Sequence, residues 1–291
     1  MVCADSARVE ARIVSSSEAH RESPHEHREE KKAERHGVPE GELVYRSVRQ
    51  DGDHALQCTS GELAWSGLAA GISMGFSLAG EGLLRTYLPD AHWAPLVTKL
   101  GYALGFLIVV LGRQQLFTEQ TLTAILPLLS RDRPWGTFTN VGRLWVVVLA
   151  TNLLGAAFFA LAAARTPIFP ADVQAAFTQI GHTAMAHGPL VTTLRGIPAG
   201  FLIAMMIWLL PVAGPAKIWI ILFLTYFVGL GGFSHIIAGS AEGLYVVFAG
   251  ERGFGEYVTS FLIPTFVGNS AGGVALVALL AHAQHAPEES R

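Results

Sequence analysis

The sequence predicts an all-α membrane protein with six transmembrane helices in an inverted three-plus-three repeat, in which the second and fifth helices are broken. Three observations support this fold class. Apolar runs of roughly twenty residues, the length that spans a bilayer core, recur along the chain. Two polar stretches, residues 116–121 and 232–240, interrupt such runs at matching places. Short motifs of the first half also return in the second half in the same order.

The composition excludes an ordinary soluble domain. Of 291 residues, 51% are apolar and only 15% are charged, and the charged residues concentrate in the first sixty positions. The formal net charge of -3 is too small to indicate a nucleic-acid partner. Both cysteines, Cys3 and Cys58, precede the first apolar run, so we expect no thiolate metal site. We also expect no cofactor.

The first sixty residues are polar and mixed in charge, and they lack the apolar centre of a signal peptide. Such a stretch buries too little apolar surface to offset the entropy of ordering. We therefore expect a flexible cytoplasmic tail with some transient helix over residues 1–60, a membrane domain over 61–285 and a short tail over 286–291. A docking role is the alternative to a solvated extension for the first tail.

Six apolar segments follow this tail. They cover about residues 63–88, 93–111, 138–164, 190–212, 218–230 and 257–281, and the two broken segments continue as 122–129 and 236–248. Gly231 and Gly232 free the backbone at the second break, and Arg113 is costly next to lipid at the first. Unwound backbone at membrane depth is tolerated where protein or a water-filled cavity satisfies it, so both breaks indicate a substrate path.

Matches in sequence link the two halves of the membrane domain. Thr118 precedes Asn152 by 34 residues, and His235 precedes Asn269 by the same 34. With three spans in each half, the second half enters the membrane in the opposite sense, which gives the inverted repeat. The aligned segments are 71–76 with 196–201, and Asn152-x-x-Gly155 with Asn269-x-x-Gly272.

The distribution of Lys and Arg predicts the orientation. The N-terminal tail is rich in both, and the loop after the second segment carries Arg131 and Arg133. The connection between the third and fourth segments has Arg165 and then nothing basic until Arg195. Because basic loops stay in the cytoplasm, we expect a cell (inner) membrane protein with both termini cytoplasmic.

Three motifs resemble those of the formate/nitrite transporter family. Residues 116–118 with 121–123 resemble the loop in its broken second helix. Residues 233–238 resemble its central-histidine segment, and residues 264–273 resemble its sixth-helix signature. The resemblance covers about residues 62–283.

This resemblance implies an aquaporin-like protomer, a homopentamer and a separate pore in each protomer. Family members move small monovalent anions such as formate, nitrite or hydrosulfide, often with a proton. By position, the implied pore constrictions are Leu116 and Phe117 on the cytoplasmic side, and Tyr102, Phe106, Phe227 and Val228 on the outer side.

His235 and Thr118 are the central polar residues of the predicted path. An anion that enters a constriction of low dielectric constant loses its hydration, and protonation to the neutral acid avoids that cost. Histidine exchanges protons near neutral pH, and a threonine hydroxyl can orient the ring or the substrate. A packing histidine is the alternative interpretation of His235.

The first break departs from the family pattern at Glu119, where a small residue is usual. A carboxylate opposes an anion, so we expect Glu119 to pair with Arg113 or Arg143, with a place in the pore as the alternative. The Lys that the family places ahead of its fourth helix is missing, and His182 and His187 are candidates to replace it.

Two asparagines and two glutamates remain within the spans. Asn152 and Asn269 are expected to brace the broken helices by hydrogen bonds to freed backbone groups, with a substrate contact as the alternative. Glu81 and Glu242 each need a partner or an aqueous face, and the sequence identifies neither.

The sequence therefore favours a channel or transporter for a small monovalent anion or its neutral acid, linked to protons through His235. An aquaporin-like pore for a small neutral solute is the alternative within transport. A membrane scaffold that binds partners through its charged tail is the alternative outside it. No signature of an enzyme appears, and no phosphate-binding loop indicates ATP-driven transport.

Overall fold

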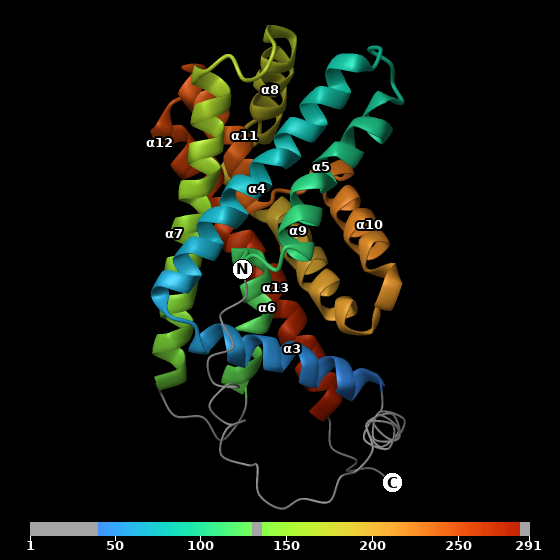
Figure 1. Cartoon of the computed structure of the whole chain (residues 1–291), viewed down its shortest axis with the longest axis vertical. Coiled ribbons are helices and arrows are strands. Elements are labelled where there is room, and N and C mark those ends of the chain that lie inside the picture. The colour runs from blue at the N-terminus through green and yellow to red at the C-terminus, as the bar shows by residue number, and fades with distance from the viewer. Residues whose placement is uncertain (1–39, 130–135, 286–291) are drawn as a thin grey trace, which may run out of the picture.

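The computed structural model describes residues 40–129 and 136–285, and this part of the chain folds into helices without any strand (Figure 1). The prediction of an all-α protein is thus confirmed for these residues. The helices are α3 (Glu40–Gln57), α4 (Ser60–Tyr87), α5 (Ala94–Leu111), α6 (Phe117–Thr123), η1 (Leu126–Leu129), α7 (Gly136–Arg165), α8 (Ala171–Ala184), α9 (Pro189–Leu209), η2 (Leu210–Val212), η3 (Gly214–Ala216), α10 (Lys217–Leu230), α11 (Ile236–Ala249), α12 (Phe254–Glu256), the π-helical turn η4 (Tyr257–Leu262) and α13 (Ile263–His285).

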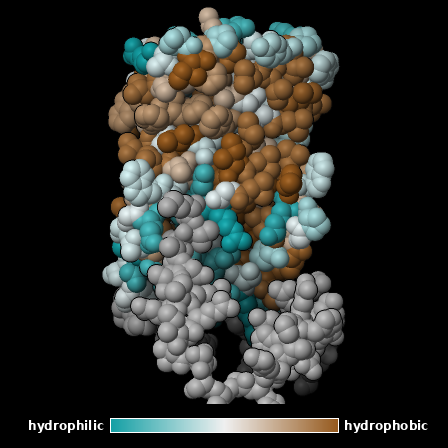
Figure 2. Space-filling model, viewed as in Figure 1, coloured by the Kyte–Doolittle hydropathy of each residue, from teal (hydrophilic) through white to brown (hydrophobic). Residues whose placement is uncertain are grey.

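Four of the described helices are long and apolar enough to cross a membrane. They are α4, α5, α7 and the continuous segment Pro189–Val212, and they coincide with four of the expected spans. Gly214–Leu230 and Ile236–Ala249 are shorter apolar helices. Apolar residues dominate the upper part of the face seen in Figure 2, and hydrophilic residues lie along its top rim and in a band below its middle.

The bundle has two distinct ends. Helix α3 lies across one end and α8 lies at the other, with α4, α5, α7 and α9 between them (Figure 1). We refer to these ends as the α3 side and the α8 side.

Residues 40–57 form the ordered helix α3, which differs from the flexible tail expected over residues 1–60. Val44 and Val48 are buried on one face of this helix, in a cluster with Leu122 and Trp208. A Cβ atom at Gly52 would lie 2.0 Å from the carbonyl oxygen of Thr123, so α3 packs directly on the backbone of α6. The apolar face of a short helix offsets its ordering cost even within a charged segment. Residues 1–39 lie outside the described residues.

Arg143 of α7 fixes the junction between α3 and α4. Its guanidinium donates hydrogen bonds of 3.0 Å to the carbonyl oxygens of Leu56 and Cys58. Thr59 and Glu62 then form a capping box that starts α4. Arg143 is therefore occupied at a helix junction.

Candidate functional site

The two breaks have nearly the same backbone path. Helix α5 ends at Leu111 and α10 ends at Leu230, and each is followed by one residue in the left-handed region, Arg113 at φ 49° and Gly232 at φ 61°. The chain then extends and enters a short helix, α6 after Leu116 and α11 after His235. The breaks thus place two helix N-termini inside the bundle.

Asn152 and Asn269 hold these breaks with equivalent hydrogen bonds. The Oδ1 atom of Asn152 accepts from the Phe117 amide, and that of Asn269 accepts from the Ile236 amide, both at 2.9 Å. The two Nδ2 groups donate to carbonyl oxygens of the break and of a neighbouring helix, which are Gln115 and Gly67 for Asn152, and Ser234 and Gly196 for Asn269. Each amide therefore satisfies backbone groups that the break leaves without helical partners.

These contacts correct one detail of the alignment between the halves. The glycines in equivalent contact with the two asparagines are Gly67 with Gly196, and Gly71 with Gly200. A Cβ atom at Gly71 or Gly200 would lie 2.0 or 2.1 Å from the carbonyl oxygen of Asn152 or Asn269. The alignment of residues 71–76 with 196–201 is therefore displaced by one helical turn, because small residues recur every four positions in α4.

Thr118 and His235 meet between the two short helices. The distance from Thr118 Oγ1 to His235 Nε2 is 2.9 Å, and the Nδ1 atom of the same ring accepts a hydrogen bond from the Ala238 amide at 3.2 Å. Since Nδ1 acts as an acceptor, Nε2 carries the proton and donates it to the threonine hydroxyl. His235 is thus a neutral ring that also caps α11.

Apolar side chains close the space around this pair. Phe106 packs edge-on against the His235 ring with centroids 4.9 Å apart, and it also contacts Tyr102. Phe117 stacks on Phe266 at 5.5 Å. Leu116, Phe117 and Phe106 are fully buried. The Thr118–His235 pair therefore lies in a layer without an open passage.

A cavity lies on each side of this layer. The larger, of about 460 Å³, is on the α3 side and is lined by Asp51, Arg113, Glu119 and Lys217, among other residues. The smaller, of about 70 Å³, is on the α8 side and reaches Tyr102 and His235. Polar residues thus lead to the closed layer from both ends of the bundle.

Glu119 lines the cavity on the α3 side without an ion pair to any other described residue. Its Oε1 atom is buried and accepts no hydrogen bond. The expected pairing with Arg143 is wrong, because that guanidinium binds the α3–α4 junction. Arg113 shares the cavity with Glu119 but does not lie within ion-pair distance of it.

The cavity on the α8 side contains cations that the sequence analysis did not assign. These are Lys99 of α5 and Arg195 of α9, which line it together with Glu242 of α11. His187, one of the two histidines expected to replace the missing Lys, also lines this cavity. The Arg195 guanidinium also donates to the Gly232 carbonyl, which ties it to the second break. Positive groups therefore occur there although the expected Lys is missing.

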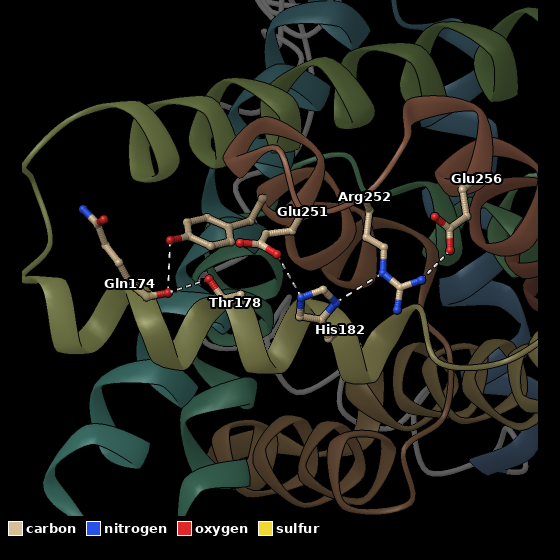
Figure 3. A network of polar contacts seen from close by, with 7 residues as sticks. Gln174, Thr178, His182, Glu251, Arg252 and Glu256 are labelled. Carbon is tan, nitrogen blue, oxygen red and sulfur yellow. Dashed lines mark hydrogen bonds and ion pairs between the residues drawn. The ribbon is translucent and has the colours of Figure 1, made fainter.

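His182 is engaged elsewhere, at the end of α8 (Figure 3). Its Nδ1 atom accepts a hydrogen bond of 3.2 Å from Arg252 Nε, and its Nε2 atom lies 3.7 Å from a carboxylate oxygen of Glu251. Arg252 also pairs with Glu256 at 2.6 Å. This network joins α8 to the segment after α11, whereas His187 faces the cavity.

Six of the expected pore residues line neither cavity. Thr118, Leu116, Phe117 and Phe106 belong to the closed layer, and the other two are Phe227 and Val228. The side chain of Phe227 is 55% exposed on α10 and contacts Phe233, so it faces away from the Thr118–His235 layer. Val228 is fully buried in the core. Residues that line the cavity on the α8 side and were missed include Phe233, Ser234 and Phe261. An all-round apolar helix such as α10 gives no periodicity from which to choose its inward face.

Four of the described helices are long enough to span a membrane, two braced breaks interrupt apolar segments, and polar cavities lie on both sides of a closed layer. These features are typical of a membrane transport protein. The chain belongs to the formate/nitrite transporter family, whose sequence profile matches residues 42–283. It is 41% identical over 244 residues to the inner membrane protein YfdC of Escherichia coli (strain K12), a match that covers 83% of this chain and 77% of that protein. The family suggested by the sequence motifs is thus confirmed.

Solved structures share the fold. An FNT family ion channel matches with a TM-score of 0.70 and 18% identity, covering 83% of this chain and 98% of that one. A pentameric formate channel with formate bound matches with a TM-score of 0.66 and 19% identity, covering 78% of this chain and 98% of the other. At these identities the likeness concerns the fold.

Proposed function

We propose that this protein conducts a small monovalent anion, with formate as the first candidate, or its neutral acid across the membrane past Thr118 and His235. The observation that carries the proposal is the pair of braced breaks that bring Thr118 and His235 within 2.9 Å between two polar cavities. The formate bound in a channel of the same fold supports this choice of substrate.

The substrate enters by replacing the contact between these two side chains. The Nε2–H group of His235 and the hydroxyl of Thr118 are both donors, and an anion placed between them accepts a hydrogen bond from each. Charge-assisted bonds of this kind are about twice as strong as neutral ones, which offsets part of the lost hydration. The surrounding Phe106 and Leu116 exclude water.

Proton transfer to the substrate completes the proposed cycle. The neutral His235 ring first takes up a second proton at Nδ1 from the cavity on the α8 side, in place of the hydrogen bond from the Ala238 amide. The imidazolium then gives its Nε2 proton to the anion, which leaves the ring neutral and forms the neutral acid, and this acid crosses the apolar layer at a lower cost than the ion.

The assembly and the orientation in the membrane are further parts of this proposal. We propose an aquaporin-like protomer with six spans in an inverted repeat, assembled as a homopentamer like the solved formate channel. Large apolar side chains such as Phe138, Val146 and Phe158 are exposed on α7, where lipid or neighbouring protomers would cover them. In this proposal the α3 side faces the cytoplasm, the side on which the basic loops predict both termini.

Flux in proteoliposomes tests this function. Formate, nitrite, hydrosulfide and chloride are measured over a range of pH for the wild type, for His235→Ala and for Phe227→Ala as a matched control. We expect formate flux that rises toward acid pH, is lost in His235→Ala and is kept in Phe227→Ala, because Phe227 is exposed on the outside. Equal, pH-independent flux in all three proteins would exclude the histidine mechanism.

A pore for a small neutral solute is a second candidate, and Glu119 is the observation that favours it. Its carboxyl lines the cavity on the α3 side with one oxygen unpartnered, an arrangement that repels an anion. In that case the flux of water or a small amide exceeds that of formate, does not depend on pH and survives His235→Ala.

A further inference from the structure

Two buried glutamates and one lysine meet beside the cavity on the α8 side. Glu81 comes from α4, Lys99 from α5 and Glu242 from α11, so three helices contribute to one cluster. Glu81 is 2% exposed and forms an ion pair with Lys99. Glu242 is 8% exposed and lines the cavity together with Lys99.

The charges of this cluster do not balance. Lys99 is committed to one oxygen of Glu81, and the second oxygen of Glu81 is buried without a partner. Within the part of the chain that the structure describes, the Glu242 carboxyl accepts no hydrogen bond. A buried carboxylate without a partner is unfavourable, and a second carboxylate nearby makes it more so. One proton on Glu242 leaves the cluster neutral.

Other titratable groups face Glu242 from the elements around it. They are Glu81 of α4, Lys99 and Tyr102 of α5, Arg195 of α9, and His187 and His235, which line the same cavity. Lys99 is already neutralised by Glu81, and the Arg195 guanidinium is directed to the Gly232 carbonyl. None of these contacts supplies a hydrogen bond to Glu242.

We propose that Glu242 is a proton-binding site of the cavity on the α8 side, with the Glu81–Lys99 ion pair as its fixed electrostatic support. The carboxylate takes one proton from the adjacent water to become the carboxylic acid, and it returns that proton on deprotonation. This site is distinct from His235, because the carboxyl lies seven residues further along α11, on the second turn after the break.

Protonation of Glu242 also decides what the cavity admits, and this part rests on the proposed anion transport. The cavity of about 70 Å³ has the volume of about two water molecules. An ionised Glu242 in so small a space repels an anion, whereas the acid donates a hydrogen bond to it beside Arg195. An anion and a proton therefore enter this cavity together.

Infrared difference spectroscopy on the full-length protein in lipid tests the proton site without any transport. The measurement is the C=O stretching band of a protonated carboxyl, followed over pH for the wild type, Glu242→Gln and Glu81→Gln. We expect the wild type to have a component of this band that is absent from Glu242→Gln and that disappears as the pH rises. In Glu81→Gln the freed Lys99 pairs with Glu242, so the band is lost even though Glu242 is present.

Two results would overturn the proposal. One is a protonated-carboxyl band of equal area in the wild type and in Glu242→Gln. The other is a Glu242 band that persists in Glu81→Gln, since the ion pair would then not control Glu242. Size-exclusion elution and thermal unfolding identify any variant that fails to fold, and Glu242→Asp, which keeps the carboxyl, restores the band if the site is right.

Formate flux measured with the pH varied on the α8 side then tests the role in transport. A single coupled proton site adds up to about tenfold per pH unit to the dependence of the flux on pH. We expect Glu242→Gln to lose this added steepness relative to the wild type. An infrared band without any formate flux contradicts the proposed substrate and leaves the proton site standing, whereas flux without the band contradicts the proton site.

Discussion

The contact between Thr118 and His235 involves a hydroxyl that is fully buried and a ring that is 1% exposed. Because Nδ1 is occupied by the Ala238 amide, the Nε2–H of the ring depends on Thr118 for its hydrogen bond. Because water is excluded from this site, the Thr118 hydroxyl stabilises the fold as the acceptor for Nε2–H and also takes part in the proposed binding of the anion. Substitutions of Thr118 test both roles at the scale of a single residue.

Thr118→Val removes the hydroxyl and keeps the shape of the side chain. The Nε2–H of His235 then has no acceptor, and leaving a buried donor unpaired costs about 1–3 kcal/mol in the free energy of unfolding. We expect a lower Tm and loss of formate flux for Thr118→Val. Thr118→Ser keeps the hydroxyl, so its Tm and its formate flux should stay close to those of the wild type. Equal Tm and equal flux in Thr118→Val and Thr118→Ser would contradict the role of the hydroxyl.

At the scale of elements, the two breaks follow the same path with different residues at the left-handed position. Gly232 adopts φ 61° at little cost, whereas Arg113 adopts φ 49° with a side chain. The first break therefore carries backbone strain that the second lacks. Arg113 also lines the cavity on the α3 side, where its charge lies among polar side chains.

Substitution at this position should act in opposite directions in the two breaks. An L-residue in the left-handed region costs about 1–2 kcal/mol, so Gly232→Ala should lower the free energy of unfolding by about that amount. Arg113→Gly should be more stable than Arg113→Ala, which removes the same charge and keeps the strain. Thermal unfolding of the purified protein measures both differences, and an Arg113→Ala variant as stable as Arg113→Gly would show that the strain is relieved elsewhere.

The stability with which helix α3 is docked on the bundle depends on pH through Asp51. Burial raises the pKa of Asp51 above its ordinary value of 3.8, while the nearby Arg113, His54 and Lys217 act in the opposite direction. Since the folded-state pKa is raised, protonated Asp51 stabilises the docked helix. This stability is fully present below about pH 3.8 and is lost as the pH rises through the folded-state pKa.

Asp51→Asn should therefore stabilise the docking of α3 at neutral pH. We expect slower amide hydrogen exchange in residues 44–57 than in the wild type at pH 7, and a smaller difference at acid pH. Glu42→Gln is a suitable control, because Glu42 is exposed and its ion pair among the described residues is with Arg46 one turn away. Faster exchange in Asp51→Asn would mean that the ionised carboxylate holds α3 in place.

At the scale of the whole molecule, the sequence predicted what depends on local signals. The two breaks and the equal spacing from Thr118 to Asn152 and from His235 to Asn269 are legible because each motif is short and its polar residues stand out against apolar surroundings. The structure puts both asparagines in hydrogen bonds with the breaks. Such features need no knowledge of which helices are neighbours.

What the sequence did not predict depends on packing between distant segments. The Glu81–Lys99 ion pair joins two helices, and Glu242 approaches it from a third, so no spacing reveals the cluster. The exposed side of α10, which carries Phe227, could not be chosen because that helix is apolar all round. Helix α3 was missed for a different reason, because its narrow apolar face is hidden among charged residues.

The two cavities differ in their charge, and this asymmetry has a consequence for transport. On the α3 side, the Glu119 carboxyl lies next to Thr118 in the chain, without an ion pair to any described residue. On the α8 side, the acidic groups are accompanied by Lys99 and Arg195. An anion therefore meets its least compensated negative group on the α3 side.

Glu119→Gln tests whether that group limits the flux. At an effective dielectric constant of about 20, a unit charge 5 Å from an anion raises its energy by about 3 kcal/mol. Screening by Arg113 and Lys217 in the same cavity reduces this, so at a pH at which the Glu119 carboxyl is ionised we expect formate flux to increase by about tenfold, which corresponds to about 1.4 kcal/mol. Glu42→Gln, an exposed carboxylate on α3, should leave the flux unchanged. The flux of a neutral solute should be the same in all three proteins, because it has no charge for Glu119 to repel. A decrease of formate flux in Glu119→Gln would instead make Glu119 a group that passes protons to the substrate.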